Sequence, residues 1–498
     1  MKRHSLVLVT VDCLRADHVG FQGYSRRITP FLDSLAETSV VFSDAIVAGA
    51  PTYFSFPAIM ASRYPLSLGR EILGIAPDEP TLATALRDAG YRTAAFVAGN
   101  PYLSPRFGYH QGFDEFRDFL AAARPEGSKE LTHPAGKRLS EFNRRIEAVS
   151  RRTGLTEAAY NELYFWYCQW LSAREHLSFD QLRRYPAADV VIDQARSWLN
   201  QQGDQPFLLW VHLMDPHHPY YPPPEALSAL GMSHISARHA RRLNAFWNRG
   251  DVGPRRLQRY RSEILSLYDA GVYWVDKQIA RFVDALRQSQ RWNETVFVVT
   301  ADHGEEFLEN GVRYHSPMSL PEQLIHVPLL LRAPELAGSR ILQGPFSLIH
   351  LAPTLLESVG VQVPGSFQGR SRWEQISSGT LPSEPAIAEC IEACNNPFHV
   401  DGRIRPRLLA VRDREYKLVI RFSDKTDRFY DLKNDPEEHS PLPGGVQTRE
   451  RARLLQVAGA HLEKTRNNRN AGLALGARLH ELVQSIAAEG KPSASPLV

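Results

Sequence analysis

An aspartate and a histidine stand side by side directly after a buried-looking apolar run, residues 296–299. Asp302 and His303 follow this run, and Gly304 comes next. Continuous β-branched runs are typical of parallel strands, and open α/β sheets carry their chemistry at the carboxyl ends of such strands. A carboxylate oxygen and an imidazole nitrogen together suit a divalent cation such as zinc or manganese. Taken alone, the same residues are equally compatible with a turn that carries a solvated histidine.

A second carboxylate, Asp12, ends the apolar run of residues 5–11. If both strands belong to one sheet, Asp12 reaches the same edge as Asp302 and His303, and the three side chains converge on one ion. The competing interpretation is that Asp12 caps a following helix. The convergence favours one shared divalent cation, and the residue types alone leave Ca²⁺, Mg²⁺, Mn²⁺ and Zn²⁺ open.

Six segments, in the same order, resemble the sulfatase family of the alkaline phosphatase superfamily: residues 9–18, 28–36, 207–220, 300–306, 351–356 and 429–437. The resemblance implies an alkaline-phosphatase-like, doubly wound α/β sheet flanked by helices, with a small C-terminal α+β subdomain. It also implies metal-dependent hydrolysis of an anionic ester substrate, a sulfate or a phosphate ester.

The segment that matches the family's nucleophile departs from the family pattern. Sulfatases of the main type carry Cys-x-Pro-x-Arg, and the Cys is oxidised to formylglycine. Alignment on Arg63-Tyr64-Pro65 places Thr52 at the Cys, Phe54 at the Pro and Phe56 at the Arg. The family's Lys-x-His pair is likewise replaced, by Asn100-Pro101-Tyr102. Formylglycine chemistry is therefore excluded at this position.

The resemblance implies that Thr52 acts as the nucleophile and as a fourth metal ligand beside Asp12, Asp302 and His303. A metal or a base can activate such a hydroxyl. Phosphoethanolamine and lipoteichoic-acid transferases resemble this chain in using a metal-bound Thr, and residues 305–315 resemble their sequence. A phospho-group transferase through Thr52 and a non-catalytic sulfatase-fold protein are therefore the alternatives. Ser55 is a fallback nucleophile, or else a cap for a helix predicted to begin near Phe56.

The resemblance assigns supply of the leaving-group proton and stabilisation of charge to His217 and His315. Each is otherwise a plain loop histidine. His212 and His218 belong to the same segment as His217, but strand alternation leaves the direction of their side chains undefined.

Three polar groups that hold the sulfate oxygens in the family are absent, so we expect ordinary aryl sulfates to be poor substrates. Phe54 and Phe56 are expected to line the pocket instead. An ester with an apolar substituent should then fit better.

Composition limits the remaining function classes. The formal net charge is +3 over 498 residues, which argues against a dedicated nucleic-acid binder. Arginines cluster in residues 235–261, typical of a solvated helical face and compatible with an anionic substrate or a peripheral membrane contact. We find no secretory signal and no apolar run near the ~20 residues of a membrane span, so we expect a cytoplasmic location. The cysteines, Cys13, Cys168, Cys390 and Cys394, are few and scattered, which favours reduced, structural thiols.

The periodicity predicts three regions. Residues 1–375 form the catalytic α/β domain, in which strands and helices alternate and the core strands run parallel. Residues 119–180 form a helical insertion within it, and packing against the core is favoured for its aromatic cluster at 160–171 over a lid, a dimer face or a membrane contact. Residues 376–445 are strand-rich, and residues 446–498 are a helical tail with a disordered end at 491–496.

Overall fold

The computed structural model describes residues 3–70, 72–120, 154–172, 177–336, 338–447 and 449–465. The first part of the predicted insertion, the last part of the tail and its expected disordered end lie outside the described residues.

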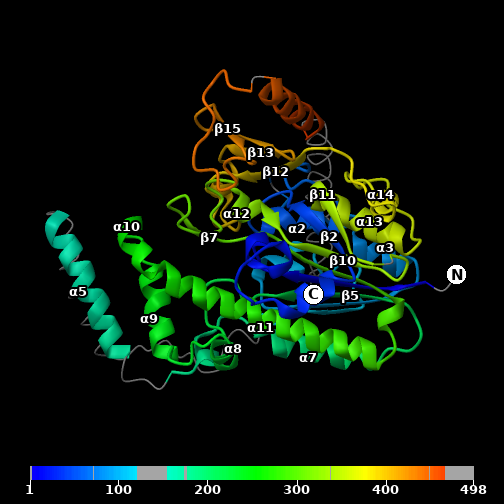
Figure 1. Cartoon of the computed structure of the whole chain (residues 1–498), viewed down its shortest axis with the longest axis horizontal. Coiled ribbons are helices and arrows are strands. Elements are labelled where there is room, and N and C mark those ends of the chain that lie inside the picture. Colours follow the sequence, from blue (N-terminus) through cyan, green and yellow to red (C-terminus); the bar gives the residue numbers. More distant parts are fainter. Residues whose placement is uncertain are drawn as a thin grey trace, which may run out of the picture.

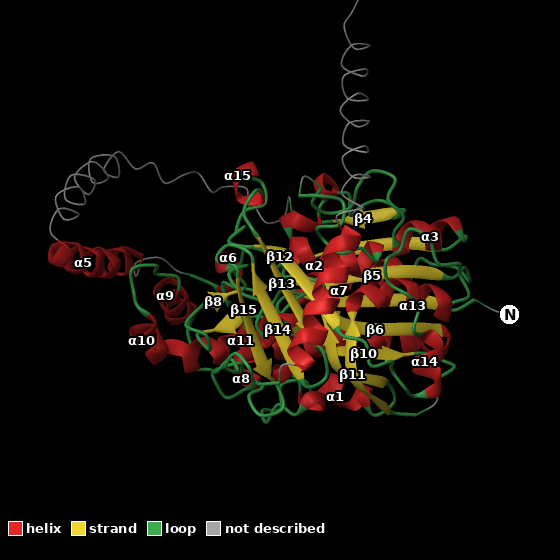
Figure 2. Ribbon diagram, turned by 90° about the horizontal axis from the view of Figure 1, so that it is seen from above, coloured by secondary structure: helices red, strands yellow, loops and turns green. Residues whose placement is uncertain are grey.

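A large sheet forms the centre of the molecule (Figure 2). Its strands are ordered β11-β2-β10-β6-β1-β5-β3-β4, and β9 pairs with β2. In chain order the strands are β1 (Ser5–Val11), β2 (Val40–Ile46), β3 (Arg92–Val97), β4 (Glu115–Arg117), β5 (Phe207–Leu213), β6 (Thr295–Ala301), β9 (His326–Val327), β10 (Leu329–Arg332) and β11 (Arg340–Ser347). β1 lies between β5 and β6 and is parallel to both. Nearly every residue of these three strands is buried, as their continuous apolar sequences predict.

The sheet is mixed, not wholly parallel as the sequence predicted. β10 is antiparallel to both β6 and β2, and Leu329 pairs with Thr300. A parallel connection needs a crossover, usually a helix. Residues 302–328 instead hold only the hairpin β7 (Glu306–Phe307) and β8 (Arg313–Tyr314), the short helix α12 (Glu322–Ile325) and β9. The chain therefore returns into the sheet from the edge at which β6 ended.

Helices cover both faces of this sheet (Figure 1). One layer contains α1 (Pro30–Ala36), α7 (Ala188–Leu199) and α11 (Arg261–Gln288), in which α11 contacts both of the others. The other contains α2 (Thr52–Ala61), α3 (Leu82–Asp88) and α13 (Leu351–Ser358). This three-layer arrangement confirms the predicted α/β class.

A second, antiparallel sheet follows near the C-terminus. It consists of β12 (Ala386–Ile391), β13 (Arg407–Arg412), β14 (Tyr416–Arg421) and β15 (Thr426–Asp431), in that order. A helix over residues 449–465 packs Leu454 and Ala458 against the apolar face of this sheet. The predicted strand-rich segment is thus present, with a helix on one of its faces.

An arm of helices extends from the main body (Figure 1). In it, α5 (Gly154–Ser172) packs Phe165 against Phe246 of α9 (Ala237–Trp247). Five large side chains of α5 are each at least 37% exposed: Leu163, Tyr164, Trp166, Tyr167 and Trp170. Packing of the whole aromatic cluster against the core, which the sequence favoured, is therefore wrong for these five. Among the described residues, no helix has the length and apolarity needed to cross a bilayer.

Candidate active site

The ends of β1 and β6 bring three predicted ligands together. Val11 pairs with Ala301 in the parallel ladder, so Asp12 and Asp302 leave the sheet at the same level. His303 is central to the group: its Nε2 lies 3.5 Å from Oδ2 of Asp302 and 3.8 Å from Oδ1 of Asp12. All three residues are fully buried. The convergence that the sequence predicted is present.

Thr52 joins this group from the start of α2. Its Oγ1 lies 3.1 Å from Nε2 of His303. The helix begins at Thr52, not near Phe56 as the sequence predicted, so the positive end of its dipole lies at this group of side chains. Ser55 lies inside that turn and donates its hydroxyl to the carbonyl of Thr52, so it is not the cap of the helix.

The four side chains fit a divalent cation. Ligands bound ~2.0–2.2 Å from a four-coordinate ion lie roughly 3.3–3.6 Å from one another. The separations around His303 Nε2, 3.1 to 3.8 Å, bracket that range. In addition, Oδ2 of Asp302 is buried and has no hydrogen-bond partner among the described residues. A carboxylate oxygen in that state is costly unless a cation supplies the missing partner.

The two carboxylates differ in their surroundings. Burial raises the pKa of Asp302, and the charge of Asp12 raises it further. Burial acts on Asp12 in the same sense, but His217, His212 and His303 outweigh it and hold the pKa of Asp12 well below its ordinary value. Without an ion, the proximity of the two carboxylates therefore favours a proton on Asp302. A bound cation would displace that proton.

Asn100 and His212 hold Asp12 in place. Asn100 Nδ2 donates to Oδ2 of Asp12 at 2.9 Å, and Nε2 of His212 lies 3.3 Å from the same oxygen. Nδ1 of His212 is in turn 2.9 Å from the hydroxyl of Thr10. From the sequence, His212 is a weak candidate and Asn100 is noted only because it replaces a residue of the family's Lys-x-His pair. Neither periodicity nor a motif predicts which side chains contact a carboxylate at a strand end.

A cavity of about 550 Å³ opens above Thr52. The residues that line it combine aromatic rings, imidazoles and two arginines: Thr52, Tyr53, Asn100, Tyr102, Arg184, Tyr185, Met214, His217, His218, Arg313, Tyr314 and His315 among others. Two guanidinium groups at its wall suit an anion, while the aromatic rings suit an apolar substituent. Neither Arg184, in a loop, nor Arg313, in the short strand β8, belongs to a motif that marks a binding residue.

The expected role of Phe54 and Phe56 as pocket lining is wrong. Both are fully buried and neither lines the cavity. Phe56 instead packs edge-on against Tyr109 and His212 and lies beside Trp210. Residues that replace the family's Pro and Arg have thus become core, because successive positions of a helix point in different directions.

His217 and His315 lie beside each other, with ring centroids 4.9 Å apart, and the ring of His315 lies 4.7 Å from that of His303. Burial, together with the neighbouring His218, lowers the pKa of His217 to about 3. Burial opposes protonation of His315 as well, but the carboxylate of Glu305 outweighs it and raises the pKa of that histidine. The two predicted histidines therefore differ: His217 favours its neutral form, whereas His315 holds a proton more readily than an ordinary histidine.

Glu305 is a residue of this site that the sequence did not single out. It is fully buried, and its Oε1 lies 3.2 Å from Nδ1 of His315. His315 and His218 together hold the pKa of Glu305 well below its ordinary value despite burial. Its position two residues after His303 was the available signal.

Cys13 also reaches the site. Its backbone has φ 62°, which is uncommon outside glycine, and its carbonyl accepts the hydroxyl of Tyr268. The thiol donates to Oδ1 of Asp12 at 3.1 Å and lies 3.5 Å from Nδ1 of His315. Cys13, Cys390 and Cys394 are free thiols, as predicted, while the side chain of Cys168 lies outside the described residues.

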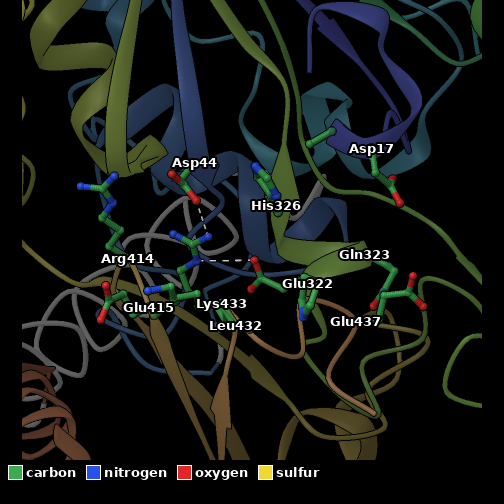
Figure 3. Close-up of a pocket in the computed structure, with 13 residues that line it drawn as sticks. Asp17, Asp44, Glu322, Gln323, His326, Arg414, Glu415, Leu432, Lys433 and Glu437 are labelled. Atoms are coloured by element: carbon green, nitrogen blue, oxygen red, sulfur yellow. Dashed lines mark hydrogen bonds and ion pairs between the residues drawn. The ribbon is translucent and has the colours of Figure 1, made fainter. Parts of the chain in front are cut away.

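A second cavity, of about 660 Å³, lies between the two sheets (Figure 3). Asp44, Glu322 and His326 meet side chains of the C-terminal segment there, among them Arg412, Arg414 and Lys433. Arg412 forms ion pairs with both Asp44 and Glu322. The charges of Asp44, Glu322 and Arg412 are thus paired within the protein.

Comparison with known proteins agrees with this geometry. Residues 4–361 match the sulfatase family, and residues 314–466 match the family described as N-sulphoglucosamine sulphohydrolase, C-terminal. An uncharacterized sulfatase, YidJ, of Escherichia coli is 25% identical over 492 residues, covering 94% of this chain and 88% of the relative. A sulfatase of Formosa agariphila is 24% identical over 461 residues, covering 87% of this chain and 82% of the relative.

Solved structures show the same fold. A protein in complex with its substrate D-glucosamine-2-N,6-O-disulfate superposes with a TM-score of 0.68 at 17% identity, covering 94% of this chain and 99% of that one. The phosphonate monoester hydrolase of Agrobacterium radiobacter superposes with a TM-score of 0.63 at 18% identity, covering 94% and 96%. With a family match over most of its length, the chain belongs to the sulfatase family of sulfuric ester hydrolases, within the alkaline phosphatase superfamily.

Proposed function

We propose that this protein is a metal-dependent hydrolase of a sulfate, phosphate or phosphonate ester, with Thr52 as its nucleophile. One observation carries the proposal: Thr52 Oγ1 lies 3.1 Å from His303 Nε2, at a helix start that faces two buried carboxylates. A hydroxyl in that position has the surroundings that activate it for attack.

Asp12, Thr52, Asp302 and His303 would hold one divalent cation. When bound, such an ion lowers the pKa of a coordinated hydroxyl and offsets negative charge on the ester oxygens. Asn100 and His212 orient Asp12 for this role through their contacts with its Oδ2.

The remaining steps use side chains of this chain. Arg184 and Arg313 draw an anionic ester into the cavity. The hydroxyl of Thr52 releases its proton to water, and its oxygen bonds to the phosphorus or sulfur atom while the bond to the alcohol oxygen breaks. His315, which Glu305 keeps protonated, gives its proton to that oxygen. Water then cleaves the ester on Thr52 and restores the hydroxyl.

The substrate follows from the cavity walls. Tyr53, Tyr102, Tyr185 and Tyr314 surround the opening, so an aromatic or other apolar substituent finds contact there. A bare sulfate group finds fewer fixed cations here than in the usual family site, because Phe56 and Asn100 stand in place of charged residues. We therefore expect simple aryl sulfates to be poor substrates. The apolar contacts come from these tyrosines and not, as the sequence predicted, from Phe54 and Phe56.

A panel of esters tests the proposal. The protein is stripped with a chelator, reloaded separately with Ca²⁺, Mg²⁺, Mn²⁺ or Zn²⁺, and assayed on nitrophenyl sulfate, phosphate, phosphate diester and phosphonate monoester. Metal-dependent turnover, together with a mass increase on Thr52 during turnover, is expected. Absence of turnover and of adduct in every combination would refute it, and turnover that depends on an added alcohol would indicate a transferase instead.

A further inference from the structure

One face of α5 presents large apolar side chains to solvent. Leu163, Trp166, Tyr167 and Trp170 recur at the three- and four-residue spacing that aligns side chains along one face of a helix. Leu163 is 72% exposed and Trp170 is 56% exposed. The outer face of a solvated helix normally carries polar and charged residues, and a contiguous apolar stripe in their place marks an interaction site.

Contacts on another face of α5 fix the orientation of this stripe. There, Phe165 packs edge-on against Phe246 of α9, with ring centroids 5.6 Å apart. Glu162 pairs with Arg249 at 2.8 Å and with Arg256 at 2.6 Å. The guanidinium of Arg249 also lies over the ring of Phe165, 4.8 Å from its centroid. Since α5 holds a defined face toward the rest of the arm, the stripe is presented outward.

The arm around this stripe is positively charged. Four exposed arginines of α9, of α10 (Pro254–Leu257) and of the turn after it have no ion pair among the described residues: Arg238, Arg242, Arg255 and Arg259. Arg255 and Arg259 stand one and three residues from Arg256, in the short helical segment that contacts α5. The nearby acid Asp251 is already paired with Arg249. The arm therefore offers cationic side chains to an anionic partner.

Aromatic rings together with arginines favour a lipid surface as that partner. Trp and Tyr rings prefer the boundary between acyl chains and headgroups, where the ring is buried and its polar atom stays hydrated. Arginine forms paired hydrogen bonds with phosphate. A second copy of the chain fits less well, because it would bring the arginines of two arms together.

We propose that α5, α9 and α10 dock the protein on the surface of an anionic phospholipid membrane (Figure 1). The stripe of α5 lies in the plane of the headgroup boundary, and the four arginines contact lipid phosphates. The arm also contacts the wall of the cavity above Thr52, since Arg313 donates from Nη2 to the carbonyl of Arg249 at 3.2 Å. The docking surface is thus joined directly to the cavity.

Cosedimentation with vesicles tests the docking. The full chain is mixed with vesicles of phosphatidylcholine alone or of phosphatidylcholine with phosphatidylglycerol, and we expect binding to the anionic vesicles. The double variant Trp166→Ser/Trp170→Ser should weaken that binding at least ~10-fold, because it removes two rings from the boundary. Arg255→Gln/Arg259→Gln should weaken it by roughly 10-fold or more, and added salt should act in the same direction.

Matched controls remove the same chemistry elsewhere. Ile341→Ser/Ile404→Ser takes away two exposed apolar side chains outside the arm, and Arg370→Gln/Arg428→Gln takes away two exposed arginines outside it. Both should bind anionic vesicles as the unaltered protein does. Tryptophan emission of the unaltered protein, which brominated anionic lipid should quench, adds a measurement that requires no variant to fold.

The outcomes separate this proposal from the proposed function, because binding is measured without substrate. No binding of the unaltered protein to anionic vesicles, or no quenching by brominated lipid, overturns the docking and leaves the Thr52 hydrolase standing. Equal binding to neutral and anionic vesicles overturns the contribution of the arginines. A dimer seen by light scattering that Trp166→Ser/Trp170→Ser dissociates would assign the stripe to a second copy and overturn the proposal. Unchanged vesicle binding in that variant, with circular dichroism showing it folded, likewise overturns it.

Discussion

Two cavities open at the same edge of the central sheet, yet their charges are organised in opposite ways. Above Thr52, buried oxygens of Asp302 and Glu305 have no hydrogen-bond partner among the described residues. Between the two sheets, Lys417 contacts Glu322 at 3.1 Å and Glu438 at 2.9 Å, while Arg412 reaches Asp44 and Glu322. In the first cavity, buried carboxylate oxygens remain available to a ligand. In the second, the carboxylates form ion pairs with cationic side chains of the protein.

The difference teaches where function and stability reside. Between the two sheets, each buried carboxylate pairs with a cationic side chain of the protein, and these pairs connect the sheets. Removal of either partner would leave an uncompensated buried charge. A buried carboxylate whose partner is absent weakens the fold until a ligand arrives. The cavity of Figure 3 is therefore a structural junction, although it is the larger of the two.

Thr52→Ala should give the largest effect. If the hydroxyl forms a covalent intermediate, kcat/KM should fall by at least ~10³-fold while the free energy of unfolding changes little. Steady-state kinetics and chemical denaturation measure the two quantities. Thr52→Ser keeps a hydroxyl and should retain part of the activity. Full activity in Thr52→Ala, combined with loss in Ser55→Ala, would move the nucleophile to Ser55.

Lys417→Met should affect stability instead. Lys417 is fully buried between Glu322 and Glu438, so we expect a loss of about 3–5 kcal/mol in the free energy of unfolding. Urea titration measures it. Arg281→Gln is the control, because the ion pair between Arg281 and Asp193 is exposed and should contribute under about 1 kcal/mol. Equal losses in the two variants would remove the distinction between a buried junction and a surface pair.

Sequence reasoning brought Asp12, Asp302 and His303 together because the positions of residues at strand ends follow from simple rules. The apolar runs before Asp12 and Asp302 predict parallel strands, and parallel strands end at one edge, which the level pairing of Val11 with Ala301 confirms. The choice of Thr52 as the candidate nucleophile followed from a motif resemblance, and in the structure its Oγ1 lies 3.1 Å from Nε2 of His303.

The residues that were missed depend on tertiary contacts. Asn100, Glu305 and Cys13 reach the site from loops, whose course is set by packing and not by periodicity. Cys13 has a φ of 62°, and nothing in the sequence predicts this conformation for a non-glycine residue. In this conformation the thiol lies 3.5 Å from Nδ1 of His315. Phe56 shows an incorrect prediction. Its alignment with the family's Arg predicts a position in the pocket wall, but its side chain is buried in the core.

Asp302→Asn sharpens the comparison from the side of the first cavity. In the presence of a chelator, this change should leave the free energy of unfolding equal or raise it by up to ~1 kcal/mol, because it removes a carboxylate buried beside Asp12. The gain in Tm that a bound cation gives the unaltered protein should disappear. Differential scanning calorimetry with and without metal measures both. A marked loss of stability in chelator would show that Asp302 is already satisfied within the fold.

The smallest effect should appear in the pH dependence of the junction. Burial would raise the pKa of Glu322, but Lys417 and Arg412 outweigh it and lower the pKa to about 2. A carboxyl group with a lowered pKa in the folded state contributes stability that is full above its unfolded value, ~4.5, and is lost as the pH falls toward about 2. Glu438 moves oppositely, since burial raises its pKa and it accepts a proton first.

It follows that acid should remove most of the penalty of Lys417→Met. At neutral pH the variant leaves Glu322 and Glu438 as unpaired carboxylates, whereas at low pH both are neutral and Lys417 has less to stabilise. The difference in unfolding free energy between the unaltered protein and Lys417→Met should therefore shrink as the pH falls from about 4.5 toward about 2, by at most ~1.4 kcal/mol per pH unit for each proton taken up. Urea titrations at a series of pH values measure the difference. A constant or growing difference would show that Lys417 stabilises the junction through packing of its methylene chain and not through its charge.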